Sequence, residues 1–111
     1  MQPVKDASRP YTVERRSYHA VRPGFRIVEL QIGPTQTIPW HYHSQAQDTF
    51  YVISGTIRIL TRGPEEEVCL TAGQTYSVHP GRPHLVANAD DGSAVFLVLQ
   101  GMGEPDFVAL I

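Results

Sequence analysis

The regular spacing of turn residues is the feature that most limits how this chain folds. Nine glycines and nine prolines recur along the 111 residues, and the segments between them are short and rich in Val, Ile, Thr, Tyr and Phe. Segments of this composition and length are typical of β-strands, and no stretch of eleven or more residues shows a helical hydrophobic period. The pattern predicts an all-β fold, an antiparallel sandwich or barrel.

The segments between the turns define the predicted strands. Apolar and polar residues alternate in several of them, as expected where one face of a strand packs in a core. The predicted strands are residues 11–15, 25–32, 37–43, 49–54, 56–61, 66–70, 75–78, 84–88 and 94–100. We expect a single barrel domain over residues 21–111, with residues 1–20 forming an N-terminal arm or an edge strand.

Two segments are apolar at every position. Residues 94–99, AVFLVL, match a strand that is covered on both faces by a second sheet or by a partner chain. Residues 107–111, FVALI, follow the breaker Gly103-Glu104-Pro105. Because a small core has little room for both segments, they favour a homodimer; the alternative is that residues 107–111 fold back on their own barrel.

Composition excludes several classes of function. Nine Lys and Arg against eleven Asp and Glu give a net charge of −2, and the scattered basic residues form no stripe for a nucleic acid backbone. The longest apolar run is too short to span a membrane, and the first residues lack the apolar core of a signal peptide. The single cysteine, Cys69, excludes an internal disulfide and a thiolate-rich zinc site, and we expect it to be buried. These features predict a soluble, cytoplasmic protein.

The stretch WHYHSQAQDTFYVISG, residues 40–55, holds the most unusual chemistry. His41 and His43 are two residues apart, so on a strand both imidazoles project from one face. A short loop can bring Asp48 back beside them, and His84 begins a later predicted strand. Imidazoles that face the same way on an apolar strand suit a metal site, although a His-x-His pair also occurs on solvated strands.

The two histidine-containing stretches resemble the paired motifs of the cupin superfamily. The first motif joins a His-x-His pair to a later glutamate and glycine, and it is matched by His41, His43, Asp48 and Gly55. The second motif is matched at the family's spacing by Gly73, Gly81, His84 and Asn88. The resemblance covers about half of the chain and implies a cupin-type antiparallel β-barrel, also called a double-stranded β-helix or jelly roll.

Three departures from the family motifs stand out. Thr35 occupies the opening glycine position, His79 replaces a proline, and Asp48 replaces the glutamate. The resemblance implies that His41, His43, Asp48 and His84 hold a divalent transition metal: Fe(II), Mn(II), Ni(II), Co(II) or Zn(II). Because aspartate is one methylene shorter, Asp48 binds the metal directly, binds it through a water, or orients a histidine. Gln47 is the alternative ligand at a shorter gap.

Alternation along the strands selects further pocket candidates. Phe50 shares the face of Asp48, and Tyr76 shares that of Val78, so both are candidates to line a pocket and both also suit an ordinary core. His79 is a spare ligand, a general base at the pocket rim or a solvated loop residue. His19 belongs to no motif, and we assign it to the surface or an interface.

The site and the resemblance lead to three functional hypotheses. The first is a metal-dependent enzyme that acts on a small organic molecule, by dioxygenase-type or isomerase/lyase-type chemistry. The second is a metal-containing or small-ligand binding or sensor domain without turnover. The third is a barrel with a vestigial metal site that serves in assembly.

Overall fold

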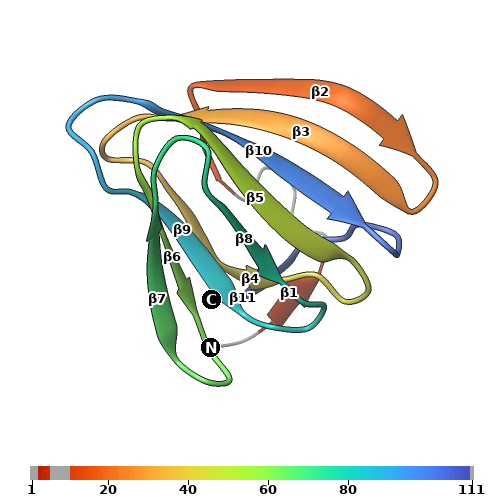
Figure 1. The fold of residues 1–111 in the computed structure, drawn as a ribbon. Coiled ribbons are helices and arrows are strands. Elements are labelled where there is room, and N and C mark those ends of the chain that lie inside the picture. Colours follow the sequence, from red (N-terminus) through yellow and green to blue (C-terminus); the bar gives the residue numbers. More distant parts are fainter. Residues whose placement is uncertain (1–2, 6–10, 111) are drawn as a thin grey trace.

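The computed structural model describes residues 3–5 and 11–110, which form two antiparallel β-sheets (Figure 1). The strands are β1 (Pro3–Lys5), β2 (Arg15–Arg22), β3 (Phe25–Ile32), β4 (Thr37–Tyr42), β5 (Gln47–Ser54), β6 (Ile57–Thr61), β7 (Glu66–Leu70), β8 (Thr75–Val78), β9 (His84–Asn88), β10 (Ala94–Gly101) and β11 (Val108–Leu110). The described residues contain no helix, and thus none with the length and hydropathy to cross a membrane.

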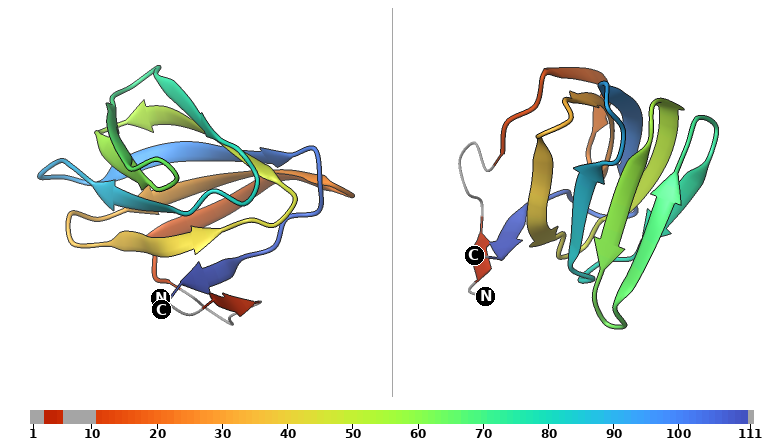
Figure 2. Two further views of the ribbon diagram at one scale, coloured as in Figure 1. Left: turned by 90° about the horizontal axis from the view of Figure 1, so that it is seen from below. Right: turned by 90° about the vertical axis from the view of Figure 1, so that its left-hand side faces the viewer.

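The two sheets lie face to face (Figure 2). The six-stranded sheet has the order β1-β11-β4-β9-β6-β7, and the five-stranded sheet has the order β2-β3-β10-β5-β8. Apart from the hairpins β2–β3 and β6–β7, consecutive strands from β2 onward alternate between the sheets, as in a jelly roll. The predicted all-β, double-stranded β-helix fold is confirmed, although the sheets do not close into a continuous hydrogen-bonded barrel.

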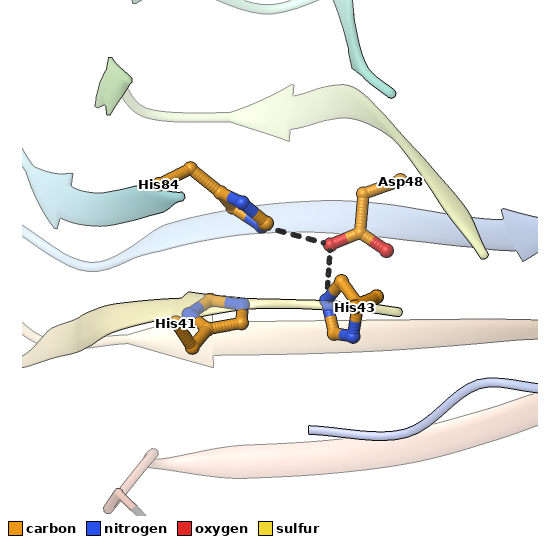
Figure 3. A group of neighbouring side chains, drawn as sticks. All are labelled: His41, His43, Asp48 and His84. Atoms are coloured by element: carbon orange, nitrogen blue, oxygen red, sulfur yellow. Dashed lines mark hydrogen bonds and ion pairs between the residues drawn. The ribbon is translucent and has the colours of Figure 1, made fainter. Parts of the chain in front are cut away.

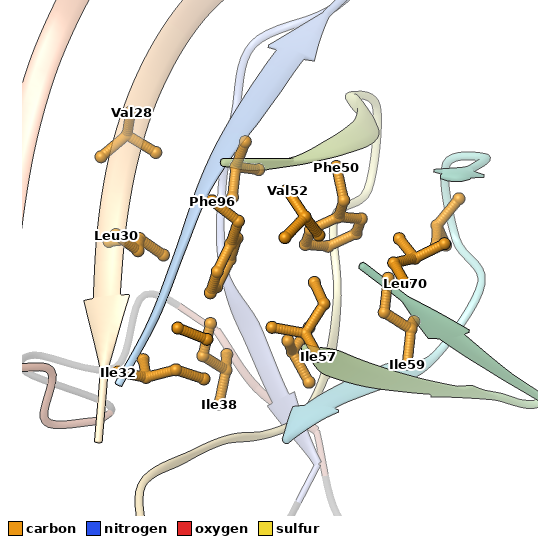
Figure 4. Close-up of a cluster of buried hydrophobic side chains, with 14 residues drawn as sticks. Val28, Leu30, Ile32, Ile38, Phe50, Val52, Ile57, Ile59, Leu70 and Phe96 are labelled. Atoms are coloured by element: carbon orange, nitrogen blue, oxygen red, sulfur yellow. The ribbon is translucent and has the colours of Figure 1, made fainter. Parts of the chain in front are cut away.

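The apolar core fills the space between the sheets (Figure 4). Phe96 and Val52 from the five-stranded sheet and Ile57 from the six-stranded sheet have no exposed surface. Gly55 supplies the turn from β5 to β6 with a φ of +79°, and a Cβ there would lie 2.9 Å from the Cα of Ala94. The motif glycine is therefore required both by its backbone angle and by the close approach of the β10 end.

Several strand predictions are correct to the residue, and others need correction. The predicted strands at residues 25–32, 66–70, 75–78 and 84–88 coincide with β3, β7, β8 and β9. The strand predicted at residues 11–15 is wrong, because the pairing with β3 begins at Arg15 and continues to Arg22. This edge strand has the mostly exposed sequence RRSYHAVR and so lacks the alternation on which prediction relied. It also crosses the predicted domain boundary at residue 20.

One side-chain prediction is wrong, and the period of two along the strands gives the reason. Cys69 is exposed rather than buried, because the period of two along β7 turns Val68 and Leu70 toward the core and Cys69 outward. Strand β10 is buried on one face only: its inward residues are buried, whereas Val95 and Leu97 on the outer face are partly exposed. Within one chain β10 is therefore not covered on both faces, and its cover by a partner chain stays a prediction.

The C-terminal apolar segment folds onto its own chain. Strand β11 pairs with β4 through Val108–Tyr42 and Ala109–His41, and on its other side it pairs with β1. Val108 and Ala109 are buried by this pairing. Of the two alternatives for residues 107–111, the described part takes the intramolecular one; Ile111 lies outside the described residues.

Candidate metal centre

Three histidines and one aspartate meet between the two sheets (Figure 3). His41 lies in β4 and His43 directly after it, whereas Asp48 lies in β5 and His84 begins β9. None of the four is more than 4% exposed. One potential ligand atom from each residue lies within 4.8 Å of those of the other three. The structure thus brings together the four side chains that the sequence selects.

Strand pairing explains why these residues converge. His41 lies opposite His84 in the β4–β9 pair, but Ile38 lies opposite Val86, so β4 has one more residue than β9 between the two pairs. This bulge at Pro39–Trp40 lets both Ile38 and His41 face inward although they are three residues apart. The backbone N–H of Gly81 donates to the carbonyl of His43 at 2.7 Å, which ties the turn before His84 to the end of β4.

Each histidine ring is held by a backbone carbonyl. Nδ1 of His41 contacts the oxygen of Pro39 at 2.7 Å, and Nδ1 of His84 contacts that of Arg82 at 2.9 Å. Nδ1 of His43 contacts the carbonyl of Asp106, in the segment that leads into β11. A carbonyl oxygen only accepts, so Nδ1 must be the donor in each ring. In a neutral ring this leaves Nε2 as the lone-pair atom that can bind a metal.

Asp48 joins the histidines through one carboxylate oxygen. Its Oδ2 lies 2.8 Å from Nε2 of His43 and 3.1 Å from Nε2 of His84. Its Oδ1 is buried and has no hydrogen-bond partner among the residues that the structure describes. A buried carboxylate oxygen without a donor is costly in an apolar interior. The aspartate, although shorter than the glutamate of the family motif, therefore reaches the histidines.

The environment shifts the pKa values of the cluster in different directions. Burial, together with the charges of His84 and His43, lowers the pKa of His41 from 6.5 to about 3. Burial also acts to lower the pKa of His43, but the hydrogen bond and charge of Asp48 outweigh it and raise that pKa. Burial acts to raise the pKa of Asp48, but hydrogen bonds from His43 and His84 outweigh it and hold that pKa well below its usual range. At neutral pH, Asp48 is ionised and His41 is neutral, the forms that bind metals.

The donor set fits a divalent transition metal. Because Nδ1 is the donor in His43 and His84, their Nε2 lone pairs would face the Asp48 carboxylate if the rings were neutral. These contacts become favourable if both rings carry a charge, or if a cation lies between the rings and the carboxylate. Two imidazolium ions beside a third buried histidine are expensive, whereas one cation accommodates all the nitrogens and gives the buried Oδ1 a partner.

A small cavity of about 30 Å³ adjoins the cluster. Its wall includes His41, His43, Asp48 and Phe50 together with Tyr11, Arg26, Val28, Leu30, Ile38, Val86, Val98, Gln100 and Phe107. Phe107 stacks on His41, with ring centroids 4.3 Å apart and an angle of 14° between the planes. A cavity of this size has room for very few water-sized groups. The apolar wall shields the cluster from bulk solvent.

The remaining candidate residues lie outside this cavity wall. Tyr76 packs against the core and lies 3.4 Å from Nη1 of Arg82, and His79 is exposed, with Nδ1 3.0 Å from its neighbour's carbonyl oxygen. Gln47 is exposed, and its amide reaches Thr49. His19 is exposed and lies 2.9 Å from Glu29.

Sequence reasoning missed two polar residues of the cavity wall. Arg26 and Gln100 both lie on it, and Gln100 is buried. The alternation of β3 contains the signal, because Arg26 has the same phase as the buried Val28 and Leu30. Gln100 likewise follows the buried Phe96 and Val98 at intervals of two.

The fold and the cluster together define a double-stranded β-helix protein with an internal group of four residues that could hold a metal ion. Residues 27–100 match the Cupin domain family. The chain belongs to the cupin family. In sequence, no curated protein matches the chain.

Solved structures with the same fold extend this comparison. The chain resembles an uncharacterized double-stranded β-helix protein from Klebsiella pneumoniae subsp. pneumoniae MGH 78578, with a TM-score of 0.72 and 27% identity over 87% of this chain and 84% of that chain. It resembles oxalate oxidase with a TM-score of 0.73 and 22% identity, over 78% of this chain and 46% of that chain. It resembles KdgF from Halomonas sp. with a TM-score of 0.71 and 17% identity, over 80% of this chain and 78% of that chain. This chain spans less than half of the oxalate oxidase chain, and the last two likenesses concern the fold alone.

Proposed function

We propose that this chain is a metal-dependent enzyme that acts on a small organic molecule in the cavity between its sheets. His41, His43, Asp48 and His84 would hold one divalent transition metal, Fe(II), Mn(II), Ni(II), Co(II) or Zn(II). The observation that carries the proposal is the convergence of three carbonyl-held histidines on a carboxylate whose second oxygen has no partner in the described part of the chain. A bound ion would supply Lewis-acid or oxygen-activating chemistry, of the dioxygenase or the isomerase/lyase type.

The protein's own residues have separate tasks in this proposal. The Pro39 and Arg82 carbonyls hold two of the rings with Nε2 directed at the centre, so little reorganisation accompanies binding. Asp48 supplies one negative charge that offsets part of the charge of the ion. Phe50 and Phe107 keep the cavity dry, which strengthens every polar interaction inside it.

Metal analysis tests the site. We would measure the metal content of the untagged protein as isolated, beside His41→Ala and Asp48→Ala, with the exposed His19→Ala as a matched control. We expect a stoichiometric metal in the wild type and in the control, its loss in His41→Ala, and a partial loss in Asp48→Ala. An unchanged metal content in His41→Ala would disprove the assignment.

Oxygen consumption separates the two kinds of chemistry. An oxygenase loaded anaerobically with Fe(II) would consume oxygen when substrate is added, whereas its Zn(II) form would not. Equal turnover by both forms would instead support isomerase or lyase chemistry, in which the ion acts only as a Lewis acid.

The small cavity favours one alternative, a binding or sensor domain without turnover. About 30 Å³ suits a small ligand better than a large organic substrate. Saturable ligand binding without product formation across a broad set of substrates would support this alternative over the enzyme.

We also propose that the protein forms a homodimer in the cytoplasm. Tyr51 and Ile53, which are 40% and 43% exposed, lie on the outer face that β10 shares, and this apolar surface suits a partner. A single unpaired cysteine suits a reducing compartment. Sedimentation of the wild type beside Ile53→Glu tests the dimer; a monomeric wild type would refute it.

A further inference from the structure

We infer that Arg26 and Gln100 form an anion-binding end of the cavity and that the ligand of this protein is a small carboxylate of few carbon atoms. This inference rests on the proposed metal site, because the carboxylate would lie between that site and Arg26. It assigns a role to two cavity residues that neither family motif contains.

Three inward-facing polar residues of the five-stranded sheet form one row across it. In the strand pairing, Arg26 of β3 lies opposite Gln100 of β10, and Gln100 lies opposite Asp48 of β5. The next row toward the interior is Val28, Val98 and Phe50, and it is apolar. The row of Arg26, Gln100 and Asp48 therefore places a cation, an amide and an anion side by side at one end of the cavity.

Arg26 has no carboxylate partner among the described residues. Its Nε donates to Oε1 of Gln100, and its guanidinium carbon lies 5.9 Å from the ring centroid of the exposed Tyr18. Among the described residues, no carboxylate forms an ion pair with Arg26, and its two terminal nitrogens have no hydrogen-bond partner. By contrast, Arg15 pairs with Glu29 at 2.7 Å and Arg82 with Glu66 at 2.6 Å. A partly buried guanidinium with two terminal nitrogens available suits the two oxygens of a carboxylate.

Gln100 directs a second donor into the same space. Its Oε1 accepts the hydrogen bond from Arg26, so its amide nitrogen must point the other way, and that nitrogen lies 3.4 Å from Nε2 of His43. Gln100 is only 4% exposed, so the amide is fixed in the wall. It therefore presents N–H groups, which an anionic oxygen accepts, between Arg26 and the histidines.

Charge and size then define the class of ligand. A divalent ion and Arg26 together carry three positive charges. Asp48 is the only carboxylate that the described residues place on the cavity wall, so the loaded site favours an anion. The remaining wall residues, such as Phe50 and Val98, suit a short carbon chain. A cavity of about 30 Å³ does not admit a sugar or an aromatic acid without rearrangement. The combination selects a short aliphatic carboxylate.

Calorimetric binding of acetate and of its neutral isostere acetamide tests the inference. Both probes would be titrated into the Zn(II)-loaded and the metal-free protein. We expect acetate to bind the loaded protein and acetamide to bind at least about tenfold more weakly, because only acetate pairs with the guanidinium. Benzoate, which has the same charge but a larger body, should also bind more weakly than acetate. Equal affinity for acetate and acetamide would overturn the inference.

Arg26→Gln is the decisive variant, and Arg58→Gln is its matched control on the outer face of β6. Arg58 is exposed, so both changes remove one positive charge, but only the first alters the cavity. We expect Arg26→Gln to weaken acetate binding at least about tenfold and Arg58→Gln to leave it unchanged. Arg26→Lys keeps the charge but loses the planar guanidinium, so its affinity for acetate should lie between those of Arg26→Gln and Arg58→Gln.

The metal content of each variant separates this inference from the proposed function. Normal metal in Arg26→Gln together with weakened acetate binding would support the anion site. Normal metal together with unchanged acetate binding would overturn it. If the wild type held no metal, the proposed function would fail, and Arg26-dependent acetate binding by the metal-free protein would still decide the anion site.

Discussion

The two ends of the space between the sheets differ sharply although the same strands build both. At one end, the row of Arg26, Gln100 and Asp48 faces His41 and His84 of the opposite sheet. At the other end, the same strands of the five-stranded sheet contribute fully buried apolar residues: Ile32, Ala94 and Val52. A displacement of four to six residues along a strand thus changes the role of an inward side chain from chemistry to packing.

Stability and chemistry are largely separate in this molecule. The apolar end removes its surface from water at little electrostatic cost. The polar end buries charges, and among the described residues the second oxygen of Asp48 has no partner. This arrangement lowers the free energy of unfolding unless a bound ligand compensates for it. Changes at the two ends should therefore have different consequences.

The largest effect is expected at the apolar end. Phe96→Ala should lower the free energy of unfolding by about 3–5 kcal/mol, because Phe96 is fully buried and its loss leaves a cavity. Urea denaturation would measure the change, and the metal content of the folded variant should remain that of the wild type. Leu97→Ala, one residue along on the partly exposed face, should cost less. An equal decrease in the free energy of unfolding for the two variants would contradict the assignment of Phe96 to the inner face and Leu97 to the outer face.

The metal-free protein should show a pH dependence that arises at the polar end. The folded pKa of His41, about 3, is below the unfolded value of 6.5, so the unfolded chain takes up a proton first as the pH falls. Stability should therefore decrease by about 1.5 kcal/mol between pH 6.5 and pH 5. Urea unfolding of chelator-treated protein would measure it, and His41→Phe should lose this part of the dependence.

His43 should act in the opposite sense. Its folded pKa is raised, so its contribution is fully present below pH 6.5 and is lost as the pH rises through the folded value. The two histidines together predict a maximum in the stability of the metal-free protein near pH 6.5. Stability that rises steadily from pH 6.5 to 8 would contradict the direction of the His43 shift.

A smaller effect is expected at Phe107, which packs against the core and stacks on His41. Phe107→Leu removes the ring that stacks on His41, so metal affinity should weaken roughly tenfold while the four ligands stay in place. Competition with a chromophoric chelator would measure the affinity. Phe25→Leu, which changes an exposed aromatic residue, is the control and should have the wild-type affinity.

The smallest effect is expected outside both ends. Cys69→Ser on the outer face of β7 should change the free energy of unfolding by less than about 0.5 kcal/mol and leave the metal content unaltered. A larger loss in urea denaturation would mean that this surface is covered in solution.

Sequence reasoning recovered what depends on local pattern. The spacing of the histidines and the aspartate in the sequence identified His41, His43, Asp48 and His84, which converge in the structure. The alternation of apolar and polar residues correctly gave the bounds of strands β3 and β9. The edge strand β2 escaped prediction because a strand that is exposed at most positions needs no apolar alternation.

Long-range pairing accounts for the rest. Gln100 and Asp48 are neighbours only because β10 inserts between β3 and β5, and no local pattern encodes that order. The same pairing places Arg26 in the row. The bulge that sets the spacing of Ile38 and His41 is likewise a property of the β4–β9 pair rather than of β4 alone.

The contact between the His43 ring and the carbonyl of Asp106 has a consequence for the order of events during protein synthesis. Sixty-three positions separate the two residues, so the ring has no fixed orientation until the ribosome has added Asp106 and that segment has docked beside β4. His41, by contrast, is held by Pro39, which is synthesised before it. The bulge that places Pro39 beside His41 depends on pairing with β9, so the whole set is in place only after β9 and the Asp106 segment have docked. A firmly held ion would therefore be acquired late in biogenesis.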